Sequence, residues 1–243
     1  MTTPVKLYRN PKSGHCHRVE LMLSLLDVPY ETIDLDMGNG AHKAPEYLRI
    51  SPLGQVPAID DSGITLSDSN GILIYLVNRY GDAPDWTGRT PVEQAESQRW
   101  LSVAAGEIAS GPAAARLVTV FGAGLDHAAA KAKAHGLFQV MDAVLADRTF
   151  LVGERLTIAD VAGYSYIAHA PEGGVSLAPY PTIRDSLARI AAPPHFDAMA
   201  KSPLPTAACP DPVPPAHCPV RPILHLQPKG RTDVGHRQSL SHR

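Results

Sequence analysis

The sequence predicts two domains of different classes: an α/β domain over residues 1–80 and an all-helical domain over residues 91–202. Short strand-like runs and amphipathic runs alternate in the first part, whereas strand signals nearly vanish in the second. Residues 81–90 between them are rich in Gly, Pro and Thr, which is typical of a linker. A chain of 243 residues has room for two modest domains, because one domain usually holds roughly 100–200 residues.

The α/β domain has the predicted element order β-α-β-α-β-β-α. Its first helix is indicated by Cys16, Val19 and Leu23, which form one stripe of an amphipathic helix. Asp60-Asp61-Ser62 separates two short apolar runs and predicts a β-hairpin. In chain order we expect a strand at 5–8, a helix at 16–26, a strand at 30–35, a helix at 42–49, strands at 56–59 and 63–66, and a helix at 72–80.

The second domain is predicted to be a helical bundle, with helices over 91–121 and 126–147 and near 182–191. Gly111-Pro112 should kink or interrupt the first of these, because proline lacks the N–H that a helix interior uses. Thr157-Ile158-Ala159-Asp160 matches a capping box with Asp in place of Glu. We interpret this box as a structural helix start.

Charge and composition exclude several classes of protein. With 22 Lys and Arg against 24 Asp and Glu, the net charge of −2 gives no general attraction to nucleic acid or an anionic membrane. No apolar run approaches the roughly 18–20 residues of a membrane span. The first residues lack a signal-peptide pattern, and three cysteines are too few for a disulfide scaffold. We therefore expect a soluble, cytoplasmic protein.

Residues 203–243 differ from the rest of the chain. They contain nine prolines, no aromatic residue and no apolar periodicity, so we expect a disordered tail. Its four histidines and two cysteines lack the spacing of a structural zinc motif, and we expect no metal site. Five basic residues against two acidic ones give this tail a charge of +3, which is too dilute for a nucleic-acid-binding arm.

Three short stretches of the α/β domain could carry chemistry. In Gly54–Ile59, Pro57 belongs at a sheet edge or a strand start, because it cannot donate to the ladder. A cis Val56–Pro57 bond would let the backbone of Val56 pair with an extended peptide, as in strand addition. A plain trans turn residue is the alternative, since only about 5–6% of X–Pro bonds are cis.

The second stretch, Leu66–Ile72, places Asp68 and Ser69 before an apolar helix stripe. They are explained either as N-caps or as groups that bind a ligand, with the Ser69 hydroxyl on a carboxylate and Asp68 on an ammonium.

The third stretch, Ser13–Val19, opens the first helix directly after the first strand. A hydroxyl and free backbone N–H groups at the positive end of a helix stabilise an anion, although a capping serine with a buried Cys16 is the simpler reading. His15-Cys16-His17 cannot converge on one metal ion, because neighbouring helical side chains point about 100° apart. Ser13 stands where a CxxC redox pair would have its first cysteine, so dithiol exchange is not expected.

Taken together, these stretches resemble the soluble glutathione S-transferase superfamily over about residues 4–200. The matching motifs are the serine-containing loop after strand one, His42-Lys43-Ala44-Pro45-Glu46-Tyr47, Ser51-Pro52-Leu53-Gly54-Gln55-Val56-Pro57-Ala58-Ile59, Leu66-Ser67-Asp68-Ser69 followed by Ile72-Leu73-Ile74-Tyr75-Leu76, and Leu151-Val152-Gly153-Glu154-Arg155-Leu156-Thr157-Ile158-Ala159-Asp160. The resemblance implies a thioredoxin-like N-terminal domain, an all-helical C-terminal domain and commonly a homodimer. The first loop is most similar to that of serine-type members (theta-, delta- or zeta-like) and their bacterial relatives.

The resemblance implies a role for each matching residue. Ser13 would be the catalytic residue, donating a hydrogen bond to the glutathione thiolate. The glutathione-binding residues would be His42, Lys43, Gln55, Val56, Pro57, Asp68 and Ser69. Val56 would pair with the cysteinyl backbone next to a cis-Pro57. Asp68 and Ser69 would hold the γ-glutamyl end, and His42, with Lys43 and Gln55, would meet the glycine carboxylate. Many members have Lys where Gln55 stands, so that carboxylate lacks one formal charge partner here.

The implied reaction is attack of the glutathione thiolate on a small hydrophobic electrophile, as in detoxification. A free thiol has a pKa near 8.5 and is a few per cent thiolate at neutral pH. A charge-assisted hydrogen bond is worth about 1.5–3 kcal/mol, or roughly one to two pKa units, and the helix N-terminus adds to it. The electrophile itself is not specified by the sequence.

Several alternatives remain open at this stage. His15, Cys16 or Tyr8 could activate the thiol instead of Ser13. If Cys16 is the working group, the protein would be a glutathione-dependent thiol reductase or lyase that forms mixed disulfides. A non-catalytic glutathione-binding module is another alternative. An isomerase of the maleylacetoacetate kind is less well matched, because Ser13-Gly14-His15-Cys16 lacks the Ser-Ser-Cys run typical of those enzymes.

Overall fold

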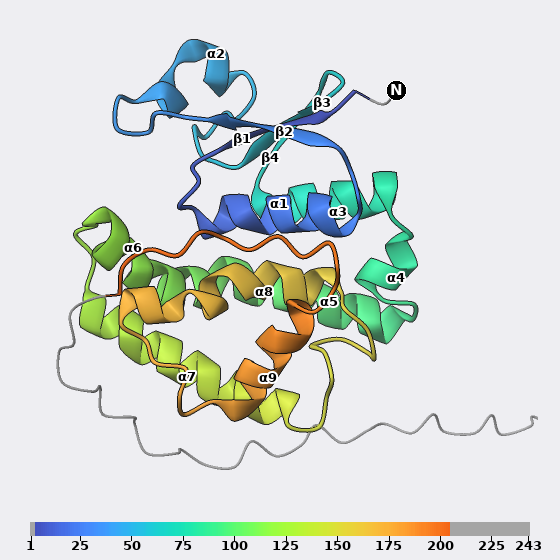
Figure 1. Ribbon diagram of the computed structural model, residues 1–243, viewed down its shortest axis with the longest axis vertical. Helices are drawn as coiled ribbons and strands as arrows, with labels where there is room; N and C mark the ends of the chain where they lie inside the picture. The colour runs from blue at the N-terminus through green and yellow to red at the C-terminus, as the bar shows by residue number, and fades with distance from the viewer. Residues whose placement is uncertain (1–2, 205–243) are drawn as a thin grey trace, which may run out of the picture.

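The computed structural model describes residues 3–204, which form an α/β domain stacked on a helical domain (Figure 1). The predicted tail 203–243 lies outside the described residues except for its first two positions. Both predicted domain classes are confirmed.

The sheet has four strands in the order β2-β1-β3-β4. β1 (Val5–Arg9) runs parallel to β2 (Tyr30–Asp34) and antiparallel to β3 (Ala58–Asp61), which forms the predicted hairpin with β4 (Ile64–Ser67). Leu7 and Ile59 pair across β1 and β3 and are fully buried. The strand expected from residue 56 begins two residues later, since Pro57 has no N–H to donate to a ladder.

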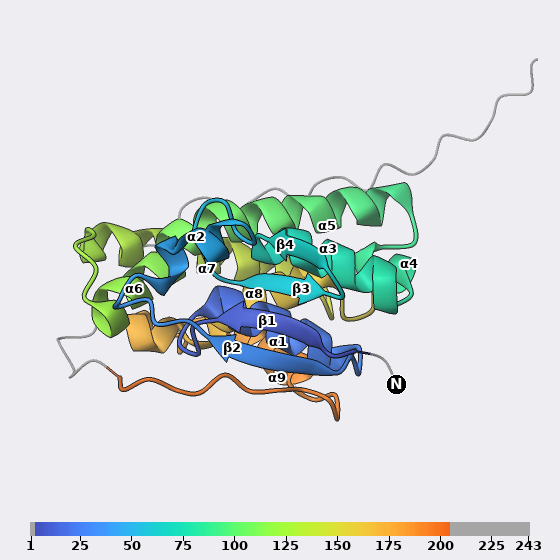
Figure 2. The same cartoon turned by 90° about the horizontal axis from the view of Figure 1, so that it is seen from above.

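Helices cover both faces of the sheet (Figures 1 and 2). α1 (Gly14–Leu25) and α3 (Ser69–Tyr80) lie on the face toward the helical domain, while η1 (Ala41–Lys43) and α2 (Pro45–Leu48) lie on the other. Because α1 packs on α3 and on a helix of the other domain, its polar positions are buried as well as its apolar stripe. The element order β-α-β-α-β-β-α is confirmed.

The helical domain starts with one long helical run, α5 (Pro91–Val103), η2 (Ala104–Ala113) and α6 (Ala114–Phe121). The α-helix is interrupted around Gly111-Pro112, as expected, but by a change of helix type: η2 is a π-helix that contains both residues and joins α5 to α6. Gly111 allows close packing there: a Cβ at this position would lie 3.1 Å from the Ala134 backbone nitrogen. A short helix, α4 (Ala83–Thr87), also forms within the predicted linker 81–90.

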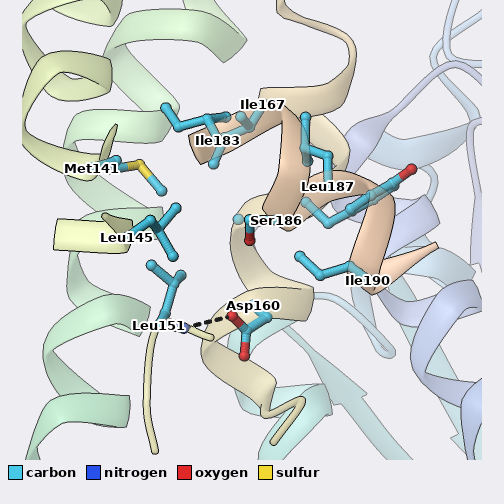
Figure 3. A pocket seen from close by; sticks show the side chains of 11 residues that line it. Met141, Leu145, Leu151, Asp160, Ile167, Ile183, Ser186, Leu187 and Ile190 are labelled. Carbon is cyan, nitrogen blue, oxygen red and sulfur yellow. Dashed lines mark hydrogen bonds between the residues drawn. The ribbon is translucent and has the colours of Figure 1, made fainter. Parts of the chain in front are cut away.

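The remaining helices are α7 (His127–Leu145), α8 (Ile158–Ala168), η3 (Ala170–Gly173) and α9 (Pro181–Ile190). The capping box at the start of α8 is confirmed: Asp160 Oδ2 accepts hydrogen bonds from the Thr157 N–H and hydroxyl, both at 2.9 Å. Asp160 Oδ1 accepts from the Leu151 N–H, also at 2.9 Å (Figure 3). Burial raises the pKa of Asp160 to about 6, with these hydrogen bonds acting in the opposite direction.

After α9 the chain crosses between the two domains. We call residues 191–204 the C-terminal strap; it is the orange-red segment below α1 in Figure 1. The Ser24 hydroxyl donates to the His195 carbonyl at 2.8 Å, and His17 Nε2 lies 2.9 Å from the Asp197 carbonyl. The strap is therefore anchored along α1 of the α/β domain.

Candidate active site

The sheet brings the three predicted stretches to one edge. Tyr8, near the end of β1, pairs with Ala58, the first residue of β3, and Ala58 pairs with Ser67, the last residue of β4. The loop after β1, the turn before β3 and the turn after β4 therefore leave the sheet side by side. These are the segments that carry Ser13, Val56-Pro57 and Asp68-Ser69.

Ser13 is the N-cap of α1 and is half-buried. Its Oγ accepts a long hydrogen bond of 3.4 Å from the Cys16 N–H. Its own N–H donates to the Asn10 carbonyl at 2.9 Å, which closes the loop. A hydroxyl can accept and donate at once, and the side chains of Cys16 and Tyr166 also lie within hydrogen-bonding reach of the Ser13 hydroxyl, so a ligand that takes its proton would replace one of them.

Cys16, the alternative working group, is fully buried. Burial raises the pKa of its thiol to about 11, although hydrogen bonds with Ser13 and the Asn10 backbone act in the opposite direction. A buried, protonated thiol is a poor nucleophile. Tyr8, another alternative, packs its ring against Tyr47 with centroids 5.8 Å apart.

Asp68 and Ser69 open α3. Asp68 is exposed, accepts from the Gly71 N–H at 2.8 Å, and has φ 76° and ψ 119°. A non-glycine residue at such a φ costs about 1–3 kcal/mol, and such residues are enriched at functional sites, although Asp27 and Ser62 also have a positive φ in turns of this chain. Ser69 is buried, and its Oγ accepts a hydrogen bond of 2.8 Å from Arg18 Nη1. Capping is therefore part of the role of Asp68, and Ser69 is tied to α1.

Arg18 belongs to this site but carried no signal in the sequence, where it is one more polar residue of α1. It is 1% exposed, and its Nη1 also donates to Asn70 Oδ1 at 2.7 Å. Nε and Nη2 are buried without a partner among residues 3–204. Burial lowers the pKa of Arg18 to about 10, so the guanidinium stays charged at neutral pH behind Ser69.

His15 lies in the first turn of α1, between Ser69 and the helical domain. Its Nδ1 is 3.3 Å from Ser69 Oγ, and its ring meets Tyr166 of α8 edge-on at 4.9 Å. Desolvation by burial and the charge of Arg18 lower the pKa of His15 to about 4, so the imidazole is neutral at neutral pH. Gly14 admits this contact with α8, because a Cβ there would lie 2.9 Å from the Tyr166 ring.

The turn before β3 holds Gln55, Val56 and Pro57. The Val56–Pro57 bond is cis, as predicted. The Gln55 carbonyl accepts from the Tyr47 hydroxyl at 2.7 Å and from the Ser51 hydroxyl at 2.9 Å, while the Gln55 residue is exposed. Val56 precedes the paired residues of β3, so it lies outside that ladder.

His42 and Lys43 lie in η1, next to this turn. Lys43 Nζ donates to the carbonyls of Leu53 and Gly54 at 3.0 and 3.3 Å, so the ammonium is already tied to the turn. His42 Nδ1 is buried and has no hydrogen-bond partner within residues 3–204. The structure thus brings both residues beside Gln55, with Lys43 serving the turn itself.

The apolar pocket in Figure 3 does not belong to this edge, because it lies between α7, α8 and α9. In the described part of the chain, His, Cys, Asp and Glu side chains form no group of three or more suited to a metal ion. Among residues 3–204, no helix has the length and apolar character of a membrane span.

Comparison with known proteins agrees with this architecture. Residues 3–78 match the family model "Glutathione S-transferase, N-terminal domain", and residues 126–194 match "Glutathione S-transferase, C-terminal domain". The chain is 32% identical over 219 residues to glutathione S-transferase 3 of Zea mays, covering 83% of this chain and 96% of that protein. It is 28% identical over 174 residues to glutathione S-transferase 2 of Anopheles gambiae, covering 71% and 83%.

Solved structures show the same likeness. The crystal structure of a glutathione S-transferase from Pseudomonas fluorescens Pf-5 matches with a TM-score of 0.75 at 28% identity, covering 81% of this chain and 99% of that one. The predicted resemblance and its two-domain fold are confirmed. By sequence, by its two matched domains and by its fold, this chain belongs to the glutathione S-transferase family.

Proposed function

We propose that this glutathione transferase uses Ser13 to hold bound glutathione as a thiolate, which attacks an electrophile placed beside the helical domain. The observation that carries this proposal is the half-buried Ser13 hydroxyl at the N-terminus of α1, beside the turns that hold Val56 and Ser69. Its cap bond is long and uses only a lone pair, so the O–H can donate to a sulfur. The α1 N-terminus adds positive potential at the same place.

The other predicted residues supply a binding surface of complementary polarity. The backbone of Val56 is outside the ladder and suits an extended cysteinyl segment. Asp68 is exposed for an ammonium, and Ser69, backed by the Arg18 guanidinium, suits a carboxylate. His42 and the exposed Gln55 suit the second carboxylate. Because Lys43 is bound to the turn, we assign it a supporting role there.

The test is the pH at which bound glutathione becomes thiolate, followed by ultraviolet absorbance. Ser13→Ala should raise that midpoint by roughly one to two pH units and lower kcat at neutral pH in proportion. Ser102→Ala is a matched control, because Ser102 is exposed on α5 and its hydroxyl donates to the Gln98 carbonyl. An unchanged midpoint in folded Ser13→Ala would overturn the assignment.

The thiol-reductase alternative predicts a different response. Since Cys16 is buried with a raised pKa, the enzyme should keep its transferase activity after treatment with iodoacetamide at neutral pH. Rapid inactivation, with the label on Cys16, would favour the reductase or lyase alternative instead.

We further propose that the chain acts as a cytoplasmic homodimer. Apolar side chains are exposed on the turn before β3, on β4, on α3 and on α5: Leu53, Ile64, Ile74 and Val92. Exposed apolar side chains of this size are candidates for burial in a subunit interface. Light scattering at micromolar concentration should give twice the chain mass, and a monomer there would contradict this proposal.

A further inference from the structure

A buried ion pair in the helical domain lies next to the loop that carries Ser13. Arg116 of α6 is 1% exposed, and its Nε donates to Glu172 Oε2 of η3 at 2.6 Å. Burial raises the pKa of Glu172, but hydrogen bonds from His169, the Ser202 N–H and Arg116 outweigh it and leave that pKa below its ordinary value. The two buried charges therefore neutralise each other.

Close packing of η3 on α6 makes this pair possible. A Cβ on Gly173 would lie 2.7 Å from the Arg116 backbone nitrogen, so only glycine permits the approach. The Thr119 hydroxyl, one turn further along α6, donates to the Glu172 carbonyl at 2.6 Å and adds a second contact between α6 and η3. The Glu172 backbone is thus fixed against α6, and its carboxylate also accepts hydrogen bonds from the Ser202 N–H and His169.

The rest of the Arg116 guanidinium reaches out of the helical bundle. Nη1 donates to the Lys12 carbonyl at 2.6 Å, which belongs to the α/β domain. Nη2 lies 3.2 Å from Ser202 Oγ in the C-terminal strap, and the Ser202 N–H donates to Glu172 Oε1 at 2.9 Å. One side chain therefore joins both domains and the strap.

The Lys12 carbonyl matters because it shares a peptide group with the Ser13 N–H. That N–H donates to the Asn10 carbonyl at 2.9 Å, and the carbonyl accepts from Arg116. With both polar atoms of this planar group held, the orientation of the peptide that enters Ser13 is fixed. The Arg116 bond is the charge-assisted one and the one supplied by the other domain.

We propose that Arg116 is a positioning residue for Ser13: through Lys12 it sets where the Ser13 hydroxyl stands, so the helical domain and the strap take part in activating the thiol. This inference rests on the proposed function of Ser13. Arg116 itself is too buried to touch a substrate. A displacement of about 1 Å at a catalytic group can cost roughly a hundredfold in rate.

The experiment uses the full chain carrying Arg116→Met together with Glu172→Gln, so that no buried charge is left alone. We expect the thiolate midpoint of bound glutathione to rise and kcat at neutral pH to fall roughly ten- to a hundredfold, with the KM for glutathione little changed. Arg116→Lys keeps the charge but not the planar set of donors, so its thiolate midpoint and kcat should lie between those of the double variant and the unmodified protein.

The control is Arg148→Met with Glu96→Gln, a partly exposed pair of the same domain with N···O 3.2 Å and no contact with the loop. It should leave the midpoint unchanged. Chemical denaturation of each variant shows whether it is folded under the assay conditions. If the Arg116→Met, Glu172→Gln variant does not fold, the test rests on Arg116→Lys: a raised thiolate midpoint supports the positioning role, and an unchanged midpoint overturns it.

Ser13→Ala separates this inference from the proposed function. If both hold, Ser13→Ala raises the midpoint, and adding the Arg116 and Glu172 changes raises it no further. An unchanged midpoint in Ser13→Ala overturns the proposed function. If Ser13→Ala raises the midpoint but the folded Arg116 variants have the same midpoint as the unmodified protein, the positioning role alone is overturned.

Discussion

The N-termini of α8 and α1 carry similar capping groups but differ in how completely these groups are bonded. At α8, Thr157 and Asp160 are both buried, and each carboxylate oxygen of Asp160 accepts bonds from within the fold. At α1, Ser13 is half-buried and accepts a 3.4 Å bond from the Cys16 N–H. Both sites are helix caps by sequence, but the Ser13 cap can still form a hydrogen bond to a ligand, whereas the capping groups of α8 are fully bonded within the fold.

This difference separates stability from function. A cap whose bonds are all internal contributes to folding and offers nothing to a substrate. A cap with a free donor contributes less to folding and can bind a ligand. The N-terminus of α3 lies between these cases, since Asp68 bonds the Gly71 N–H but stays exposed at a strained φ of 76°. We therefore expect substitutions at the start of α8 to lower stability and substitutions at the starts of α1 and α3 to lower catalysis or glutathione binding.

The largest effect is expected at α8. Asp160→Ala leaves the Leu151 and Thr157 N–H groups buried without an acceptor, so the free energy of unfolding should fall by about 3 kcal/mol or more. The specific activity of the folded fraction should stay near that of the unmodified enzyme. Urea denaturation, with activity scaled to folded protein, measures both. A stable but inactive Asp160→Ala would show that the comparison is wrong.

The next effect concerns the acid side of the stability profile. Because the pKa of His15 is lowered to about 4 in the fold, the unfolded chain binds its proton first, and stability falls as pH decreases from about 6.5 to 4. At about pH 5 this loss amounts to roughly 2 kcal/mol. Asp160, whose pKa is raised to about 6, acts in the opposite direction over an overlapping range.

His15→Asn isolates the contribution of the imidazole, because Asp160 is present in both proteins. We expect the variant to lose less stability than the unmodified protein between about pH 7.5 and pH 5. The packing lost against Tyr166 lowers the free energy of unfolding equally at both pH values, so it cancels in the difference between them. Parallel pH profiles would mean that His15 is not held neutral by the fold.

Local signals predicted the helix starts, and long-range contacts decided what surrounds them. The capping box of Thr157 and Asp160 and the polar caps at Ser13 and Asp68 could be read from neighbouring residues, because their partners lie within three positions. Arg18 and Arg116 could not, since Ser69 is 51 residues from Arg18 and Lys12 is 104 residues from Arg116. No periodicity in one segment reports such a contact.

Proline shows the same limit in the fold. The segment 81–90 was predicted as a linker from its Gly, Pro and Thr content, yet α4 forms there with Pro84 in its first turn, where a missing N–H costs nothing. Gly111-Pro112 is expected to kink or interrupt a helix, and the interruption takes the form of a π-helical stretch packed on α7. Composition indicated where the backbone is unusual, and packing determined the form that it takes.

A smaller effect is expected at α3. Asp68→Asn keeps an oxygen for the Gly71 N–H and tolerates a positive φ, so stability should change little. It removes the charge proposed to meet the glutathione ammonium, and an exposed ion pair is worth about 1 kcal/mol or less. The KM for glutathione should rise by up to about fivefold with kcat unchanged. Steady-state kinetics at saturating electrophile measures both constants, and a loss in kcat alone would contradict this role.

At Ser13 we expect the smallest effect on stability together with the largest effect on catalysis. Replacing a capping serine by glycine costs only a few tenths of a kcal/mol, because glycine leaves its backbone groups open to water. The 3.4 Å cap bond at Ser13 is long for a hydrogen bond, so little is lost with it. Ser13→Gly should therefore unfold at nearly the same urea concentration as the unmodified protein while losing thiol activation. If its stability instead fell as far as that of Asp160→Ala, Ser13 would be a structural cap like Thr157, and the distinction between the two helix starts would disappear.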